Sequence, residues 1–439
     1  MTDNQHASPP FEGPEKLLEI WFVPSAADVP DAETPDENGR TGLRKIPRQV
    51  WDDMLNIVRC KVLSVVEGAE MDAYLLSESS FFVSPHRLIL KTCGTTLNLL
   101  GLPRILEIAS TQASLHTVHR CFYSRKSFMF PDRQQGPHRD WKNEVEFLDN
   151  IFPGGAAYTV GKVNGDHWLL YMTSPVPISD VVEATSTEVP TPSIHIQDYT
   201  IEILMSDLAP SASQVFHCED PTLDGETASS HAQKLSSDLG ILDIFPRHLS
   251  VLDAYTFSPC GYSSNALIKW NVPQHQLITD IGNHPSPNPP VMQGGEGYYT
   301  IHVTPEEGWS YASFECNVPL SPRSASDATT NSETTFPDLT SLIQRVVKIF
   351  QPGRLSLTLF ISSADNEGDG GESAIEEAQR AFKAALTGPG SFSLRSKGPG
   401  VDGIATNGIK KPLYRRTDKI NYEFQGYDLA FASFELAKP

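Results

Sequence analysis

Two similar strings, about two hundred residues apart, constrain the fold of this chain more than any other feature. IFPGGAAYTVGKV spans residues 151–163, and IFQPGRLSLTLFI spans residues 349–361. Each string places an Ile-Phe pair at the end of a helical pattern, then Pro and Gly, and then the alternating residues typical of a strand. A repeat at this distance indicates an internal duplication.

Each half of a duplicated chain is expected to form antiparallel strands with helices on one face of the sheet. Two such sheets packed face to face give a helix-sheet-sheet-helix arrangement. The sequence therefore predicts an α+β protein, a four-layer αββα sandwich of two antiparallel sheets that is internally duplicated. We expect residues 1–439 to form this one domain.

The composition limits the classes of partner and compartment. The 439 residues can bury a sizeable core, and 39% hydrophobic with 20% charged residues is typical of a soluble protein with polar insertions. No apolar run approaches the length of about 18 residues expected of a membrane helix. The first ten residues, MTDNQHASPP, lack the apolar segment of a signal peptide. A net charge of −20 disfavours nucleic acid and anionic membranes as partners.

The cysteines indicate the redox compartment. They are widely scattered and form no CxxC pair, which argues against a zinc site or a disulfide framework. This usage suits a reducing compartment, so we expect a cytoplasmic protein without a metal. The six are Cys60, Cys93, Cys121, Cys218, Cys260 and Cys316.

The stretch from Leu75 to Thr96, LLSESSFFVSPHRLILKTCGTT, joins a Glu-Ser-Ser triplet, a β-type run and a Cys followed by Gly-Thr-Thr. In a bent backbone a Ser can attack the carbonyl carbon that precedes it, because proximity supplies most of what an intramolecular reaction needs. The alternative interpretation is a polar turn between two strands, formed by residues 77–80.

This stretch resembles the processing site of the eukaryotic S-adenosylmethionine decarboxylases, where LSESS, an apolar strand and LKTCGTT follow one another. The two strings stand here at residues 76–80 and 90–96. Further strings that resemble the family are FEGPEKLLE at 11–19, FYSRK at 122–126, FSPCGYS at 257–263 and YYTIHVTPE at 298–306. The resemblance covers nearly the whole chain, and it implies the four-layer αββα sandwich and the activity of that family.

The resemblance implies that the chain cuts itself between Glu78 and Ser79. The fragments 1–78 and 79–439 would stay associated, and Ser79 would become a pyruvoyl group. This group would form a Schiff base with the amine of S-adenosylmethionine and accept the electrons left by decarboxylation, so neither pyridoxal phosphate nor a metal is needed. The product would supply aminopropyl groups for spermidine and spermine synthesis.

Family positions also suggest the catalytic residues. Ser263 and His302 match the residues of the processing reaction, in which an oxyanion forms and an α-proton is removed. Cys93 matches the proton donor to the substrate α-carbon, and Glu12 and Glu15 match the active-site pair. Two alternatives remain at this stage. Cys93 and His302 could be the nucleophile and base of a hydrolase, which leaves the LSESS string unexplained, and the chain could be a catalytically idle paralogue that binds an active partner subunit.

The substrate carries a sulfonium cation and an adenine, so aromatic faces are expected to bind it. Phe11 and Phe257 match the stacking pair of the family. Glu306 matches the carboxylate that holds the ribose, because a carboxylate can accept hydrogen bonds from two hydroxyls. Glu78 is also expected to contact the substrate.

A second, acidic site is predicted on the strand-like string DYTIE, where residues 198, 200 and 202 point to one face. Acidic groups buried together need a compensating cation, and a diamine is a suitable one. We therefore expect putrescine to activate the protein, and family analogy adds a homodimer. The residues assigned to this site are Glu19, Lys91, Asp198, Thr200, Glu202 and Glu315.

Five stretches have a composition that buries little apolar surface, and we predict them to be disordered or inserted loops. Within the third of these stretches, residues 266–290 are interpreted as an insertion relative to the family. The stretches are 24–46, 174–193, 264–295, 319–337 and 363–375.

Overall fold

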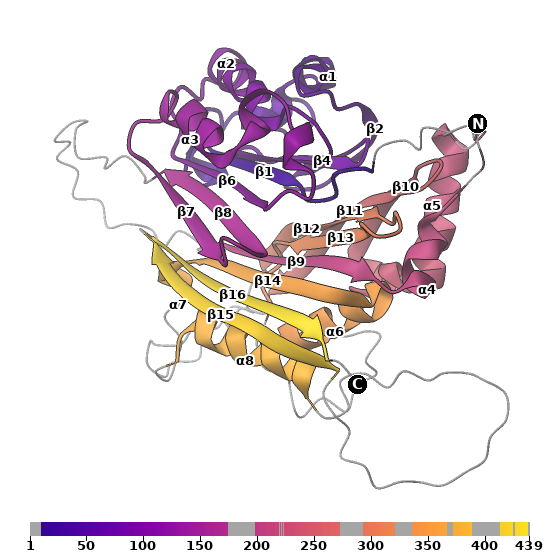
Figure 1. The fold of residues 1–439 in the computed structure, drawn as a ribbon. Coiled ribbons are helices and arrows are strands. Elements are labelled where there is room, and N and C mark those ends of the chain that lie inside the picture. The colour runs from indigo at the N-terminus through magenta and orange to yellow at the C-terminus, as the bar shows by residue number, and fades with distance from the viewer. Residues whose placement is uncertain are drawn as a thin grey trace, which may run out of the picture.

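The computed structural model describes residues 10–173, 198–218, 220, 222, 224–272, 293–320, 336–366, 372–388, 413–424 and 426–437. Two eight-stranded antiparallel sheets face each other, one from each half of the chain (Figure 1). Helices cover the outer face of each sheet. The predicted four-layer αββα sandwich is confirmed.

The first sheet has the strand order β2-β3-β4-β5-β1-β6-β8-β7. Its strands, in that order, are Val62–Glu67, Asp72–Leu76, Ser79–Val83, Arg87–Thr92, Lys16–Trp21, Arg120–Lys126, His167–Thr173 and Gly155–Gly161. The second sheet has the order β10-β11-β12-β13-β9-β14-β16-β15. Its strands, in that order, are Ser250–Thr256, Tyr262–Val272, Gln293–Thr304, Tyr311–Cys316, Tyr199–Leu208, Pro352–Ser362, Tyr427–Leu436 and Tyr414–Phe424.

The second order repeats the first with every strand number raised by eight, so the predicted duplication is confirmed. The two strings that suggested it are nevertheless not equivalent. Residues 155–161 form β7, an edge strand, whereas residues 352–362 form β14, the counterpart of β6 in the interior of its sheet. Both strings carry the Pro and Gly found at many helix-to-strand connections. Their similarity therefore reflects the same type of junction, and not equivalent positions in the two sheets.

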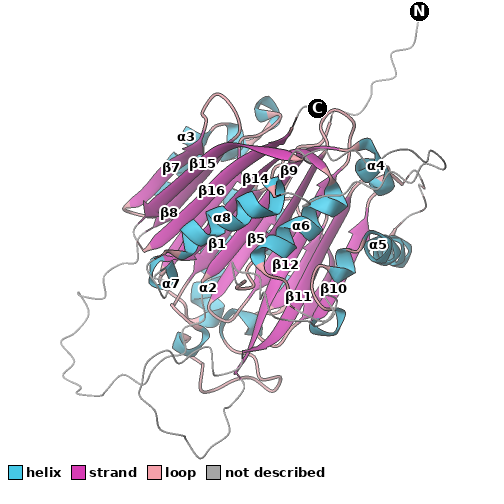
Figure 2. Cartoon of the chain, turned by 90° about the horizontal axis from the view of Figure 1, so that it is seen from below, coloured by secondary structure: helices cyan, strands magenta, loops and turns pink. Residues whose placement is uncertain are grey.

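Helices α1, α2 and α3 cover the first sheet, and α6 and α8 lie across the second (Figures 1 and 2). Helix α6 shows why such a segment forms a helix and packs against the sheet. The Asp338 side chain accepts a hydrogen bond from the Ser341 amide at its N-terminus, and its apolar residues recur at helical spacing on the buried face. The helices are α1 (Arg48–Ile57), α2 (Leu102–Ala113), α3 (Trp141–Asp149), α4 (Pro210–Ser213), α5 (Gly225–Leu239), α6 (Leu339–Phe350), α7 (Ser363–Asn366) and α8 (Ala374–Thr387).

The two faces of each sheet differ in chemistry. The helix-facing sides form two large apolar cores, one with α1 to α3 and one with α6 and α8. The space between the sheets holds small apolar clusters, and it also holds buried polar side chains such as Ser80, Lys91, Asn265, His302 and Glu315. Buried polar groups require partners, so this inner layer is where specific chemistry is expected.

The segment 24–46 contains no strand or α-helix, as a loop requires, but the expectation that it is disordered is wrong. The segment contains two 3₁₀-helices, Ala26–Asp28 and Gly42–Lys45, and its few apolar residues, among them Leu43 and Ile46, are buried. The Asp31 carboxylate accepts a hydrogen bond from the Gly42 amide at 2.9 Å. The Arg44 guanidinium lies 2.8 Å from the Asp72 carboxylate. These bonds order a polar segment whose composition alone indicated a loop.

The predicted loop 264–295 is wrong at its two ends, residues 273–292 lie outside the described residues, and the insertion at 266–290 relative to the family stays a prediction. Residues 264–272 belong to β11 and residues 293–295 to β12, because Ala266 and Ile268 alternate into the apolar core. Residues 363–366 and 374–375 are helical, which corrects the last predicted loop. The segment 174–193 and most of 319–337 lie outside the described residues. None of the helices in the described ranges is long and apolar enough to cross a membrane.

Candidate active site

The Glu78–Ser79 bond lies at the tightest turn of the first sheet. Leu76 pairs with Ser79 across the β3–β4 hairpin, so only Ser77 and Glu78 connect the two strands. Two-residue hairpin loops favour residues that accept a positive φ, usually Gly, Asn or Asp. Glu78 has φ +54°, which for a residue with this side chain costs about 1–3 kcal/mol. The predicted cleavage bond therefore follows a strained residue.

Cys93, directly after β5, contacts both partners of the predicted reaction. Its thiol donates a hydrogen bond to the carbonyl oxygen of Glu78. Its Sγ lies 3.9 Å from the Ser79 Oγ, and its amide donates to the same oxygen at 3.4 Å. Burial, together with the negative charge of Glu78, raises the pKa of the Cys93 thiol well above its ordinary value. The thiol is therefore protonated at neutral pH.

His302 and Ser263 lie opposite each other on the paired strands β12 and β11, with His302 Nδ1 2.9 Å from Ser263 Oγ. The imidazole reaches the cleavage hairpin through Ser80, whose Oγ lies 3.0 Å from Nε2. Burial lowers the pKa of His302 to about 3, so the ring is neutral. Since His302 contacts serines and Cys93 contacts the Ser79 turn, the geometry does not support the thiol-imidazole pair of a hydrolase.

The predicted substrate residues surround this turn. The Glu306 carboxylate accepts a hydrogen bond from the Phe11 amide at 2.7 Å. The Phe11 ring lies so close to Gly94 that a Cβ there would stand 2.8 Å from its Cζ, and Gly94 also has φ +62°. Phe257 begins a tight loop in which its amide donates to the Gly261 carbonyl at 3.0 Å.

Glu78 lies beside the loop that Phe257 begins. A Cβ on Gly261 would stand 3.3 Å from the Glu78 Oε1. Burial, and then the nearby Glu306 carboxylate, raise the pKa of Glu78 to about 7. Two carboxyl groups and two aromatic rings thus come together around the predicted cleavage bond.

Glu12 and Glu15 are both buried but face different parts of the molecule. The Glu12 carboxylate accepts hydrogen bonds from the Met129 and Phe130 amides, each at 2.7 Å, in the segment after β6. The Glu15 carboxylate accepts hydrogen bonds from Tyr311, at 2.9 Å, and from Ser313, both on β13 of the second sheet. The two carboxylates therefore have different hydrogen-bond partners, although both add to the rise that burial causes in the pKa of the Tyr311 hydroxyl.

The predicted diamine residues form a buried charged cluster between the sheets. Lys91 Nζ lies 2.6 Å from the Glu315 carboxylate and 3.4 Å from that of Glu202. The Tyr298 hydroxyl donates to Glu315 at 2.5 Å, and the Thr358 hydroxyl donates to Glu202 at 3.4 Å. Burial raises the pKa of Glu202 to about 7, although Lys91 opposes this effect.

Glu19 and Asp198 extend the cluster. The Glu19 carboxylate accepts a hydrogen bond from the Trp21 indole at 2.7 Å and lies 3.4 Å from the Arg87 guanidinium. Burial raises the pKa of Glu19 to about 7, and the charge of Asp198 adds to this shift. The Asp198 carboxylate accepts from the Tyr427 hydroxyl. Thr200, the remaining member, lies on β9 opposite Phe360 of β14.

Several polar residues that complete these clusters were missed from the sequence. Six of the nine stand two or four positions from a predicted residue on the same strand, as Asn265 does from Ser263 and Tyr298 from His302. Since alternate residues of a strand share a face, that spacing was the available signal. The missed residues are Ser80, Arg87, Asn265, Tyr298, Thr300, Tyr311, Ser313, Thr358 and Tyr427.

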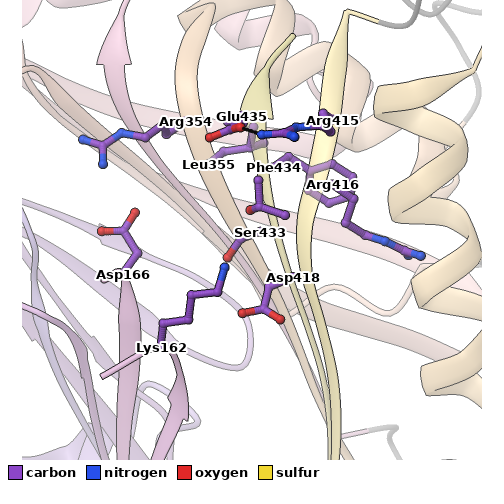
Figure 3. Close-up of a pocket in the computed structure, with 11 residues that line it drawn as sticks. Lys162, Asp166, Arg354, Leu355, Arg415, Arg416, Asp418, Ser433, Phe434 and Glu435 are labelled. Atoms are coloured by element: carbon purple, nitrogen blue, oxygen red, sulfur yellow. Dashed lines mark hydrogen bonds and ion pairs between the residues drawn. The ribbon is translucent and has the colours of Figure 1, made fainter. Parts of the chain in front are cut away.

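A cavity of about 440 Å³ lies elsewhere, where the β7–β8 turn faces β14, β15 and β16 (Figure 3). Lys162 extends toward Ser433, and Arg415 is paired with Glu435. Its lining contains none of the predicted site residues. Over the described ranges, no three His, Cys, Asp or Glu side chains are grouped as a metal site.

Comparison with known proteins shows the family. The family model for adenosylmethionine decarboxylase matches residues 8–435. The chain belongs to the adenosylmethionine decarboxylase family. It is 36% identical to the S-adenosylmethionine decarboxylase proenzyme of Xenopus laevis over 98% of this chain and 96% of that protein. It is 33% identical to the S-adenosylmethionine decarboxylase proenzyme of Saccharomyces cerevisiae over 81% of this chain and 83% of that protein.

The family also includes a similar protein from Caenorhabditis elegans, a proenzyme of the same name that is 36% identical over 82% of this chain and 78% of its own length. Among solved structures, a monomer of the Trypanosoma brucei decarboxylase covers 82% of this chain and 99% of its own, with 19% identity and a TM-score of 0.46.

Proposed function

We propose that this member of the adenosylmethionine decarboxylase family removes the α-carboxylate of S-adenosylmethionine with a pyruvoyl group made from its own Ser79. The product would be the aminopropyl donor for spermidine and spermine synthesis. Family membership along the chain supports this proposal, and the presence of every predicted catalytic residue in or beside the inner layer favours an active enzyme over an idle paralogue.

One observation carries the proposal. The Glu78 carbonyl belongs to the strained last residue of the two-residue turn, the Ser79 hydroxyl belongs to the first residue of β4, and Cys93 contacts both groups. Attack by Ser79 turns the carbonyl oxygen into an oxyanion. A thiol already donating to that oxygen stabilises the charge without reorganisation, which is the arrangement that lowers such barriers most.

The processing reaction balances with water as the only added reactant. The Ser79 Oγ bonds to the Glu78 carbonyl carbon, the peptide C–N bond breaks, and the nitrogen becomes the free amine of an ester-linked residue 79. Removal of the residue 79 α-proton then expels the Glu78 carboxylate and leaves dehydroalanine. Addition of water and loss of ammonia give the pyruvoyl group. His302, neutral and buried beside Ser263, suits the role of base for the α-proton.

The fit of the group to the site is supported by Ser79 itself. Its side chain is fully buried against the Cys93 thiol, so a carbonyl formed there would be shielded from bulk water. A pyruvoyl group supplies the electron sink for decarboxylation. Cys93, kept protonated by burial, would return a proton to the substrate α-carbon. Phe11 and Phe257 would stack on adenine, Glu306 would hold the ribose, and Glu78 would lie against the substrate. Glu12 would hold the segment after β6 over the site.

The charged inner cluster supports activation by putrescine. Five carboxylates, those of Glu15, Glu19, Asp198, Glu202 and Glu315, face Lys91, Arg87 and Arg120. A dication would offset the remaining negative charge. The fragments 1–78 and 79–439 would stay together through β1 and β5 pairing in the first sheet. A homodimer and a cytoplasmic location complete the proposal by family analogy.

The experiment measures release of labelled carbon dioxide from carboxyl-labelled S-adenosylmethionine. The wild-type chain should release it, and Ser79→Ala should release none. Ser77→Ala is the matched control, because Ser77 lies in the same turn and its Oγ only accepts a weak bond from the Lys61 amide at 3.4 Å. Equal release by Ser79→Ala and wild type would contradict the proposal.

A further inference from the structure

A buried chain of hydrogen bonds joins the cleavage hairpin to His302, and the direction of each bond can be derived. The Asn265 carboxamide on β11 lies between Tyr74 and Ser80, which stand on either side of the predicted cleavage bond. The Tyr74 backbone oxygen can only accept, so the Asn265 amide nitrogen faces it, at 3.0 Å. The carboxamide oxygen must then face Ser80.

That orientation decides where the Ser80 proton goes. A carboxamide oxygen can only accept, so the Ser80 hydroxyl donates to it, at 2.6 Å. A hydroxyl has one proton, and Ser80 therefore presents lone pairs to the His302 Nε2 at 3.0 Å. The other neighbour of Nε2 is the Thr300 hydroxyl, at 3.2 Å. Its single proton has two acceptors, the Ser80 Oγ at 3.0 Å and the Ser264 backbone oxygen at 3.1 Å, and with either one Thr300 presents a lone pair to Nε2.

Two acceptors facing Nε2 require that nitrogen to carry the proton. The ring is neutral because burial disfavours its charged form, so Nδ1 carries no proton and holds the lone pair that can accept one. Nδ1 lies 2.9 Å from the Ser263 hydroxyl, which donates to it. All five side chains are buried, so water does not compete for these bonds. The side chains are Ser80, Ser263, Asn265, Thr300 and His302.

We infer that Asn265 is a positioning residue for self-processing: through Ser80 it fixes His302 in the Nε2–H tautomer and so makes Nδ1 the basic nitrogen. The inference rests on the proposed function, since it names how the processing base is prepared. Asn265 contacts neither Ser79 nor the bond to be cut. It acts on the base through Ser80, and its bond to Tyr74 ties the strand before the cut to the sheet that carries the base.

The direct test is the tautomer of His302, read from ring ¹⁵N chemical shifts in the uncleavable Ser79→Ala chain, with His302→Gln to assign the signal. The Nε2–H form is expected. The Nδ1–H form would overturn the inference, and this measurement requires no change at Asn265. Addition of Asn265→Ala to this chain should abolish the preference for the Nε2–H tautomer. An unchanged Nε2–H signal in the double variant would also overturn the inference.

The matched control is Gln379→Ala. Gln379 on α8 is another buried carboxamide that donates to backbone oxygens, 3.2 Å from Ile420 and 2.9 Å from Phe431, on the far face of the same sheet. Its removal should lower stability without moving the His302 signal. A shift of that signal equal to the one caused by Asn265→Ala would assign the effect to general loosening of the sheet and overturn the inference.

The consequence for processing is measured in an otherwise wild-type chain. Asn265→Ala should slow formation of fragments 1–78 and 79–439 by about tenfold or more, because general base catalysis is weakened. The ester should accumulate, and hydroxylamine should cleave it. Wild-type rates in this variant would refute the inference and leave the proposed function intact. An uncut wild-type chain would refute the proposed function itself.

Discussion

The β3–β4 hairpin and the β11–β12 hairpin occupy equivalent places in the two sheets, yet they differ in what they carry. The first has a two-residue turn with Glu78 at φ +54° and presents the bond to be cut. The second presents Ser263, Asn265 and His302 on its inner face. Since duplicated sheets packed face to face bring equivalent hairpins together, divergence of one into the substrate and the other into the catalyst would assemble the self-processing site that we propose.

The charged cluster shows the same complementarity. The first sheet contributes Lys91, and the second contributes Glu202 and Glu315. Neither set could be buried alone at acceptable cost, because an unpaired buried charge is far less stable than a paired one. The polar inner layer therefore makes each half depend on the other, whereas the apolar outer cores are separate.

We expect removal of Lys91 to have the largest effect on the dependence of each sheet on the other. Lys91→Met leaves the Glu202 and Glu315 carboxylates without their buried cation and should lower the free energy of unfolding by about 3–5 kcal/mol. Urea unfolding of the Ser79→Ala chain measures it. Arg354→Met is the control, because its 2.7 Å pair with Asp207 is half exposed and should contribute less than about 1 kcal/mol. Equal losses of unfolding free energy in Lys91→Met and Arg354→Met would contradict the claim that the buried pairs between the sheets stabilise the fold more than an exposed pair does.

Cys93→Ala tests the contribution of the first sheet to the cut. Loss of the donor to the Glu78 carbonyl should slow cleavage by about a hundredfold or more. A time course on denaturing gels after synthesis measures the rate. Cys316→Ala removes a thiol buried in the outer core of the second sheet, so it should reduce stability and leave the rate unchanged. An unaltered cleavage rate in Cys93→Ala would contradict the role of the Cys93 thiol in stabilising the oxyanion.

Glu296 tests how the second sheet holds the first. Its carboxylate on β12 accepts hydrogen bonds from the Ala69, Glu70 and Met71 amides, at 3.0, 2.7 and 3.1 Å, in the β2–β3 turn. Glu296→Ala should lower the free energy of unfolding by about 1–3 kcal/mol, because two partly buried amides and the buried Met71 amide lose their acceptor. Thermal unfolding of the Ser79→Ala chain measures this loss. Glu107→Ala, which breaks an exposed pair with Arg104, should change it little.

The smallest predicted effect is a pH dependence of putrescine binding. Burial raises the pKa of Glu19 and of Glu202 from 4.5 to about 7. The folded chain therefore binds more protons than the unfolded chain between these values, and stability without putrescine should fall as pH rises through that window. Putrescine should raise the melting temperature more at about pH 8 than at about pH 6, since ionised carboxylates attract the dication. Glu202→Gln should flatten the difference, and an equal rise at both pH values would contradict the assignment.

The sequence predicted the first hairpin better than the second. The string from Leu75 to Thr96 is continuous, so its turn and Cys93 could be placed from local pattern. The single β-type run expected from Phe81 to Leu90 is nevertheless two strands, β4 and β5, joined by residues 84–86. The inner face of β11 could not be placed, because SNALIKW was assigned to a loop that begins at residue 264. Its inward residues Ser263 and Asn265 are polar and its core residues Ala266 and Ile268 face the helices, which reverses the expectation that the inside of a sandwich is apolar.

Pairings across the sheets were also beyond the sequence. Glu12 and Glu15 stand three residues apart, and their shared family string suggested one role. Only the packing of the two halves sends Glu12 to the segment after β6 and Glu15 to Tyr311 and Ser313. Contacts between residues nearly three hundred positions apart leave no periodic trace, because each partner follows only the alternation of its own strand.

Intact-mass spectrometry of the freshly purified, active protein tests the central claim most directly. The account predicts two species, residues 1–78 and residues 79–439, the larger beginning with a carbonyl in place of the Ser79 amine. An active protein that consists of one unbroken 48.3 kDa chain would contradict it.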